Sequence, residues 1–133
     1  FTAFEGEEEG KPFVALVNSN IKKYSGKDKL PWFFGVSIAL KDPDQNGLPK
    51  KEELKQLYHF EDKIKKIIKD ILPCYFVGWS NWNSHRELIF YTADPKELVE
   101  KLNKVINHKL EYQFAFKAYH DPKWKTVINA YNL

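Results

Sequence analysis

Residues 42–72, DPDQNGLPKKEELKQLYHFEDKIKKIIKDIL, decide the fold, because they hold a loop followed by the longest helical pattern in the chain. A proline and two glutamates are typical of the first turn of a helix, and Pro73 cannot continue one. We therefore predict a helix from about Pro49 to Leu72. Its apolar stripe, with spacings of three and four, consists of Leu54, Leu57, Tyr58, Ile64, Ile67, Ile68 and Ile71.

Strands are predicted on both sides of this helix. Before it, the run 30–40, LPWFFGVSIAL, alternates between two faces. One face carries Trp32, Phe34, Val36, Ile38 and Leu40, and the other carries Phe33, Gly35, Ser37 and Ala39. After it, residues 74–81 and 86–92 form a predicted antiparallel hairpin with its tip at 82–85.

The C-terminal third continues the alternation of helices and strands. A capped helix starts at Asp94, and its predicted buried face is Leu98, Val99, Leu102, Val105 and Ile106. The strand 110–119 places Leu110, Tyr112, Phe114 and Phe116 inside. A closing helix, 121–131, opens at Asp121 and Pro122 and buries Trp124, Val127, Ile128 and Tyr131.

Taken together, these elements predict a single α+β domain over residues 1–133. From 30 to 119 the order is strand, helix, strand, strand, helix, strand, which is typical of a ferredoxin-like βαββαβ core with an antiparallel sheet. An N-terminal β-hairpin, 1–24, with an acidic turn between Gly6 and Gly10, and the closing helix are predicted additions. Helices are expected to cover one face of the sheet, and the added elements to extend or cap the rest.

Composition restricts the class of protein. The chain has 133 residues, 43% of them hydrophobic, which suffices for one core without disulfide or metal cross-links. A net charge of +3 does not suggest a dedicated phosphate-binding surface. One cysteine and no long apolar run favour a cytoplasmic protein without membrane spans. Because no methionine is present, we expect that the N-terminus was processed or trimmed and that a targeting segment would have been lost with it.

Four runs of sequence resemble one known family. They are GLPKKEELKQLYHFEDKI, YFVGW, RELIFYTADPKEL and DPKW, and together they are similar to the family called domain of unknown function 695. The resemblance covers the chain from about Leu30 to the C-terminus and implies no established activity. In architecture it extends to the ferredoxin-like regulatory inhibitor of ribonuclease E, which acts by binding. Where the domain of unknown function 695 family tends to have glycine before the arginine of the second hairpin strand, this chain has Ser84 and His85, so its hairpin tip is expected to differ.

The loop before the long helix matches the spacing of an EF-hand calcium loop. The matching residues are Asp42, Asp44, Asn46, Gly47 and Glu53. Against calcium, a strand rather than a helix precedes the loop, Pro49 removes a backbone donor, and Lys50 adds a positive charge at a ligand position. We therefore favour an ordinary loop, and we expect no metal site and no cofactor. The four histidines lie in different elements and lack zinc-site spacing.

Two charged residues are candidates for a site. Glu61 falls within the apolar arc of the long helix, where a carboxylate is costly unless it has a partner. A backbone or aromatic hydrogen-bond donor is the favoured partner of Glu61. The alternatives are that Glu61 is partly exposed at the edge of the helix or that it acts as a general acid or base. Arg86 is the one arginine among twenty-one basic residues. The favoured interpretation is that it pairs with a surface acid across the strands, and the alternatives are that it pairs with Glu61 or binds an anion.

Aromatic residues supply the remaining candidates. Phe33 and Tyr91 would stack RNA bases if the face away from the helices were open, although the glycine-aromatic pattern of an RNA-recognition module is absent. Burial against the N-terminal hairpin or another subunit is the favoured interpretation. Trp79 and Trp82, near the hairpin tip, are candidate anchors for a protein partner.

These features favour a non-catalytic regulatory or protein-binding domain, monomeric or homodimeric, with a partner that the sequence does not identify. The alternative is a small-ligand-binding protein or enzyme whose pocket is lined by Glu61, Arg86, Tyr91 and Trp32. RNA binding is a minor alternative. A concave cavity with convergent polar groups would favour a small ligand, and a flat apolar face rimmed by charges would favour a protein partner.

Overall fold

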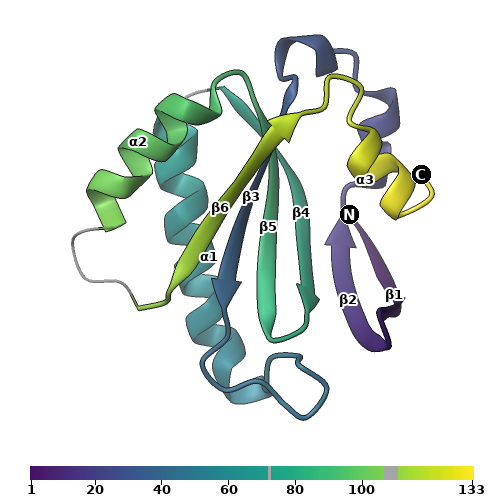
Figure 1. Cartoon of the computed structure of the whole chain (residues 1–133), viewed down its shortest axis with the longest axis vertical. Helices are drawn as coiled ribbons and strands as arrows, with labels where there is room; N and C mark the ends of the chain where they lie inside the picture. Colours follow the sequence, from purple (N-terminus) through teal and green to yellow (C-terminus); the bar gives the residue numbers. More distant parts are fainter. Residues whose placement is uncertain (72, 107–110) are drawn as a thin grey trace.

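The computed structural model describes residues 1–71, 73–106 and 111–133, without the side chains of 105 and 106. In these ranges the chain forms one six-stranded sheet and three α-helices (Figure 1). The strands are β1 (Thr2–Glu8), β2 (Lys11–Val17), β3 (Trp32–Ala39), β4 (Cys74–Trp82), β5 (His85–Thr92) and β6 (Phe114–His120). The helices are α1 (Lys51–Ile71), α2 (Pro95–Ile106) and α3 (Lys125–Ala130), and two 3-10 turns cover Ser19–Lys23 and Lys27–Lys29.

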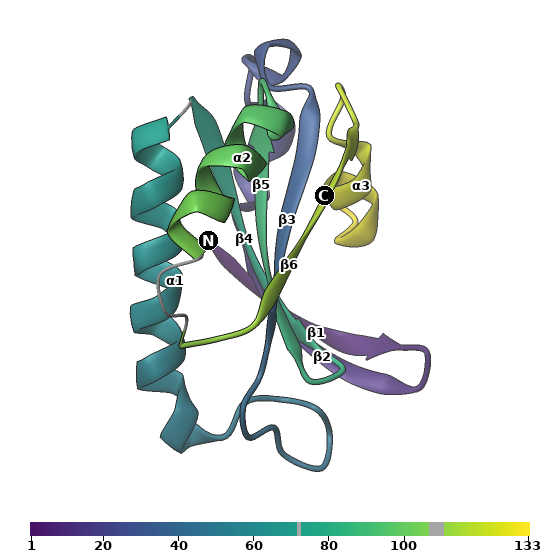
Figure 2. The ribbon, with the colours of Figure 1, turned by 60° about the vertical axis from the view of Figure 1, so that its left-hand side comes forward.

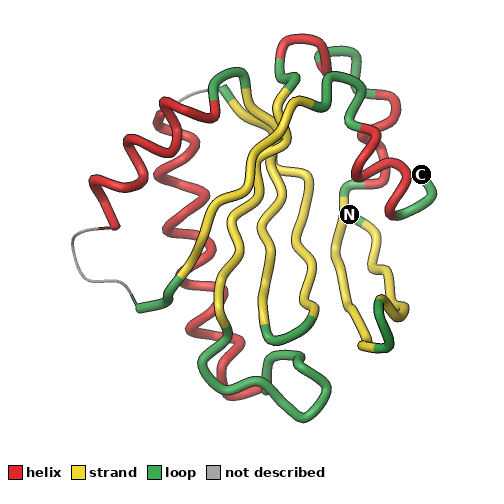
Figure 3. The backbone as a smooth tube through the Cα atoms, in the orientation of Figure 1, coloured by secondary structure: helices red, strands yellow, loops and turns green. Residues whose placement is uncertain are grey.

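The sheet has the order β1-β2-β4-β5-β3-β6, and every neighbouring pair is antiparallel. The N-terminal hairpin extends the sheet because β2 pairs with β4. Helices α1 and α2 cover one face, whereas α3 lies on the opposite side (Figure 2). The strands therefore form a middle layer between two long helices and one short one, as the tube in Figure 3 also shows. No helix in the described ranges is long and apolar enough to span a membrane.

Each face of the sheet has its own hydrophobic core. The helix-covered face buries alternate residues of the central strands, such as Phe34 and Leu88, against Leu57 and Ile68 of α1 and Leu98 of α2. The opposite face buries the residues between them. This second core contains Phe33, Ile89, Tyr91, Val17, Trp124 and Val127. The alternation predicted for residues 30–40 is thus confirmed in β3, and both faces of this strand are buried in a core.

The N-terminal hairpin pairs with β4 next to a β-bulge at Gly78. The register between β4 and β5 shifts at this point, and Gly78 has a φ of 155°. A Cβ atom at Gly78 would collide with the carbonyl oxygen of Leu16 on β2. Glycine therefore allows the close approach through which β2 pairs with β4.

The predicted long helix is confirmed over 51–71, and residue 72 lies outside the described residues. Its predicted stripe was wrong at one position. Tyr58 is 45% exposed, while Phe60 is buried against Tyr112 and Phe114, with ring centroids 5.1 and 5.8 Å away. Phe60 is buried because Tyr112 and Phe114, the first residue of β6, pack against this side of α1. Helical periodicity alone does not reveal these partners.

The C-terminal elements begin later than predicted. β6 starts at Phe114, so Tyr112 is buried outside a strand, and Leu110, Val105 and Ile106 lie outside the described side chains. The N-terminal hairpin turns at Glu9 and Gly10, both with positive φ, so that Glu7 and Glu8 belong to β1 rather than to the predicted acidic turn.

Candidate functional site

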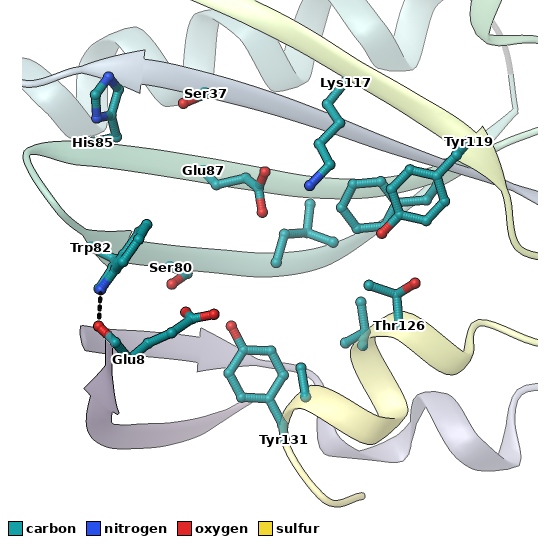
Figure 4. A pocket seen from close by; sticks show the side chains of 14 residues that line it. Glu8, Ser37, Ser80, Trp82, His85, Glu87, Lys117, Tyr119, Thr126 and Tyr131 are labelled. Atoms are coloured by element: carbon teal, nitrogen blue, oxygen red, sulfur yellow. Dashed lines mark hydrogen bonds between the residues drawn. The ribbon is translucent and has the colours of Figure 1, made fainter. Parts of the chain in front are cut away.

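A hollow of about 400 Å³ lies on the sheet face that α1 and α2 leave uncovered (Figure 4). The central strands form its floor, the N-terminal hairpin one side, and α3 with the following residue another. Its polar lining comes from Glu8, Ser37, Ser80, His85, Glu87, Lys117, Thr126 and the hydroxyls of Tyr119 and Tyr131. Groups from five strands and the closing helix segment thus converge on one concavity.

Small side chains explain why the sheet is hollow here. Glu87 of β5 lies opposite Ser80 of β4 on one side and Ser37 of β3 on the other. The next residue on this face of β3 is Gly35, and a Cβ atom there would lie 2.9 Å from Oε2 of Glu87. The carboxylate therefore occupies space that any larger residue at position 35 would fill.

Glu87 carries a carboxylate at the floor of this hollow. Among the described residues, its carboxylate accepts no side-chain hydrogen bond and forms no ion pair. Burial raises the pKa of Glu87, the charge of Glu8 acts in the same direction, and Lys117 opposes both. A raised carboxyl pKa in a cavity is typical of binding and catalytic sites.

Aromatic side chains enclose the polar groups. The indole Nε1 of Trp82 donates a hydrogen bond to the carbonyl oxygen of Glu8, 3.0 Å away, which fixes the end of β1 beside the hollow (Figure 4). Tyr119 stacks on Phe33 with ring centroids 4.6 Å apart. Burial raises the pKa of Tyr131, and the nearby charges of Glu87 and Glu8 add to this effect. Burial likewise raises the pKa of Tyr119, so both hydroxyls are neutral at physiological pH and keep a proton that they can donate.

The wall formed by α3 is anchored through Asp121. Its carboxylate accepts the hydroxyl of Tyr91 at 2.7 Å and the backbone amides of Lys125 and Thr126, both at 3.1 Å. Trp124 has a left-handed φ of 56°, so the helix begins at Lys125 rather than at Asp121 as predicted. Trp124 is fully buried, and its ring stacks on Tyr91 at 4.3 Å.

The second charged group lies on the helix-covered face. Glu61 is buried, and its Oε1 accepts Nε of Arg86 at 2.8 Å. Nη2 of Arg86 lies 2.8 Å from the same oxygen but is not aligned for a hydrogen bond. Lys65 lies 3.4 Å from the other carboxylate oxygen. The predicted burial of Glu61 is confirmed, and its partner is the arginine rather than the favoured backbone or aromatic donor.

Arg86 is enclosed by aromatic rings as well as by its acid. Its guanidinium carbon lies 3.8 Å from the ring centroid of Trp79 and 5.2 Å from that of Tyr58. Nη1 donates a long hydrogen bond, 3.5 Å, to the side-chain oxygen of Asn81. Burial lowers the pKa of Arg86, and the Glu61 carboxylate opposes that shift. The favoured prediction, a surface acid as partner for Arg86, was wrong, because the arginine is fully buried.

Of the four residues predicted to line one pocket, Glu61 and Arg86 lie together, and Tyr91 and Trp32 lie elsewhere. Glu61 and Arg86 belong to the helix-covered face, whereas Tyr91 belongs to the opposite core. Trp32 lies at the far end of β3 from Ile38, the residue paired with Arg86, and packs edge-on against His120. The prediction failed because neighbours along β5 point to opposite faces, so that positions 86 and 91 have opposite parity. Of the predicted residues, Trp82 lines the hollow.

The residues predicted to stack on RNA bases, Phe33 and Tyr91, are not accessible to a ligand. Phe33 is 3% exposed and Tyr91 fully buried, because α3 and the preceding Trp124 pack on this end of the face. Bases cannot stack on rings that the protein itself covers.

The carboxylates of the calcium-like loop face different partners. Asp42 pairs with Lys50 at 3.1 Å, and Asp44 accepts the backbone amides of Asn46 and Leu48. Glu53 accepts the amides of Lys41 and Asp42 and the hydroxyl of Tyr112. The loop is therefore closed by hydrogen bonds within the protein. Within the described ranges, no group of three or more acidic, histidine or cysteine side chains is placed to hold a metal ion.

Most residues that line the hollow were not predicted as site residues, although two features of the sequence indicate where it lies. Gly35, Ser37 and Ala39 share a face of β3, which predicts a depression in a sheet otherwise rich in aromatics. Glu87 alternates with Ile89 and Tyr91 and therefore faces the same side. What the sequence does not show is that α3 and the hairpin rise around this depression.

Comparison with known proteins identifies one relationship. A family model described as "Family of unknown function (DUF695)" matches residues 2–129. No curated protein and no solved structure matches the chain.

Proposed function

The chain belongs to the family of unknown function DUF695, and we propose that it is a small-ligand-binding protein whose site is the hollow above Gly35. The observation that carries the proposal is Glu87, a half-buried carboxylate on the floor of a cavity that has no side-chain partner among the residues the structure describes. Taking a carboxylate out of water is unfavourable unless another group compensates it. A ligand in the hollow would supply that group.

The size and lining of the hollow favour a small molecule over a protein. A volume of about 400 Å³ lies at the lower end of the range of ligand pockets. Polar groups meet at its floor, and Trp82, Tyr119 and Tyr131 enclose them. This is the arrangement that distinguishes a ligand site from a flat binding face.

Protein binding through Trp79 and Trp82 stays a prediction. Both indoles already serve the fold, since Trp79 stacks on Arg86 and Trp82 donates to the carbonyl of Glu8. A partner that used either ring would compete with these contacts.

We also infer that residues 30–119 form a ferredoxin-like core within a single domain. Support comes from the element order β3-α1-β4-β5-α2-β6 and from the order β4-β5-β3-β6 inside the sheet. The hairpin continues that sheet, and α3 shares the second core with it.

Titration with indole tests the proposed function, because this uncharged ring matches the aromatic walls without demanding an ionic partner. We expect saturable shifts of backbone amide resonances at Ser37, Glu87 and Tyr131 in heteronuclear NMR spectra. Ala130→Trp adds a large ring at an exposed position that lines the hollow, and it should weaken the binding at least about tenfold.

Asn129→Trp is the matched control, because Asn129 is exposed on the same helix and does not line the hollow. This variant should bind indole as the wild type does. The proposal is overturned if neither indole nor its charged derivatives shift these resonances, or if Ala130→Trp binds them unchanged.

A further inference from the structure

Two opposite charges face the hollow without neutralising each other. Lys117 of β6 pairs with Gly35 of β3. Glu87 of β5 pairs with Ser37, and its carboxylate reaches toward Gly35. Figure 4 shows both charged side chains. Within the described part of the chain they form no ion pair. They are nevertheless close enough for Lys117 to lower the pKa of Glu87 against the effect of burial. The two opposite charges are thus separated by a gap above Gly35, the smallest residue of the floor.

The hairpin adds a second carboxylate to the same side of the gap. Glu8 lines the hollow, and its charge raises the pKa of Glu87. One cation between Glu87 and Glu8 would be attracted by both carboxylates. Lys117, on the opposite wall, offers three hydrogen-bond donors and a positive charge to an anion.

We propose that the ligand is a small ampholyte, an amino acid or a short peptide, that carries an ammonium group, a carboxylate and an apolar body. This inference rests on the proposed function. The ammonium group binds Glu87 and Glu8, the carboxylate binds Lys117, and the body packs between Trp82 and Tyr131. A molecule with one charge would satisfy one side of the gap and leave the other uncompensated.

The aromatic walls suit such a ligand for two reasons. A ligand packed against them would lose part of its contact with water, which strengthens each charge-assisted hydrogen bond. They also attract the ammonium group itself, because the faces of tryptophan and tyrosine carry negative potential. A direct contact between Glu87 and Lys117 would instead close the gap and favour a neutral ligand. The experiment therefore compares ligands that share one ring and differ in the charged groups attached to it.

Four probes share the indole ring. Tryptophan carries both charges, tryptamine carries the ammonium group alone, indole-3-propionate carries the carboxylate alone, and indole carries neither. We expect calorimetry at neutral pH and low salt to show that tryptophan binds at least about tenfold more tightly than each of the other three. Ala130→Trp should weaken all four, which assigns the binding to the hollow.

Two variants separate the contributions of the charges. Glu87→Gln should reduce the preference for tryptophan over indole-3-propionate, and Lys117→Met the preference for tryptophan over tryptamine, each by about tenfold. Both keep the approximate size of the side chain. Glu7→Gln and Lys125→Met, at exposed positions that do not line the hollow, should leave both preferences unchanged.

The outcomes separate this inference from the proposed function. If indole, tryptamine or indole-3-propionate binds in the hollow as tightly as tryptophan, a ligand site exists but the ampholyte is wrong. The same conclusion follows if Glu87→Gln and Lys117→Met keep both preferences. If none of the four probes binds in the hollow, the proposed function and the inference both fail.

Discussion

Glu61 of α1 and Glu87 of β5 lie on opposite sides of the same sheet, and their carboxylates have different surroundings. Glu61 is 5% exposed and is held by Arg86, with Lys65 beside its second oxygen. Glu87 is half-buried, faces a hollow, and has neither a side-chain hydrogen bond nor an ion pair among the described residues. The Glu61 carboxylate has a basic partner at each of its oxygens, whereas the Glu87 carboxylate has none within the described ranges.

The difference shows how burial and function are related in this domain. A buried charge with a complete set of partners belongs to the architecture, however unusual it is in the sequence. A desolvated charge beside a cavity destabilises the folded state unless a ligand compensates it. Binding sites are often found at such positions. Variants at the two faces should therefore affect different properties.

The largest effect is expected on the helix-covered face. Glu61→Gln leaves the fully buried guanidinium of Arg86 without a counter-charge. We predict a loss of about 3 kcal/mol in the free energy of unfolding, measured by urea denaturation, because breaking a buried ion pair strands its partner. Indole binding by the folded protein should be unchanged, since Glu61 does not line the hollow.

Asp62→Asn is the matched control on the same helix. Its carboxylate is 75% exposed and lies 3.7 Å from Lys65, so its removal should change the stability by less than about 0.5 kcal/mol. Equal effects of the two variants would show that the Glu61–Arg86 pair does not support the fold.

A smaller effect on stability is expected at the floor of the hollow. In Gly35→Ala, the added methyl group would meet Oε2 of Glu87 at 2.9 Å and the ring of Phe33 at 3.1 Å. The carboxylate can rotate away, so we predict a destabilisation of about 1 kcal/mol or less together with a clear loss of indole binding. Gly78→Ala provides the contrast, because its methyl group would meet the backbone of Leu16 and should destabilise the sheet much more.

The smallest effect on stability is expected for Glu87→Gln, within about 0.5 kcal/mol of wild type near neutral pH. Its informative property is the pH dependence. Burial raises the pKa of Glu87, so the folded state binds the proton more tightly than the unfolded state does. Wild type should lose stability relative to Glu87→Gln as the pH rises from the ordinary carboxyl pKa through the raised one.

Denaturation midpoints from about pH 4 to about pH 7 would measure this difference. Glu5→Gln, at an exposed position of β1, serves as the reference for loss of an ordinary glutamate. A constant difference between wild type and Glu87→Gln across this range would mean that the carboxylate is not desolvated.

Much of the fold is encoded in local patterns. Helical periodicity and the proline that follows specify α1, and strict alternation specifies both faces of β3. The side of α1 that is buried could not be derived so well, because Phe60 replaces Tyr58 only when the segment around Tyr112 packs against it. Tertiary contacts of this kind are decided by distant parts of the chain.

The two charged groups show the same limit. The sequence marks Glu61 because a carboxylate interrupts an apolar stripe, and its burial follows. Glu87 stands in an ordinary alternating strand and gives no such signal. Its importance depends on Gly35 and Ser37 of β3 and on Glu8 of β1, which lies 79 positions away in the chain. A site assembled from separate strands becomes visible when their register is known.

The most direct test follows the side-chain carboxyl carbons of Glu61 and Glu87 by NMR while tryptophan is added. We predict that the Glu87 resonance shifts saturably, with the same dissociation constant that calorimetry gives, while the Glu61 resonance stays in place. A stationary Glu87 resonance at saturating tryptophan would contradict the assignment of the hollow as an ampholyte site. A shift of Glu61 as large as that of Glu87 would contradict the division between a closed and an open face.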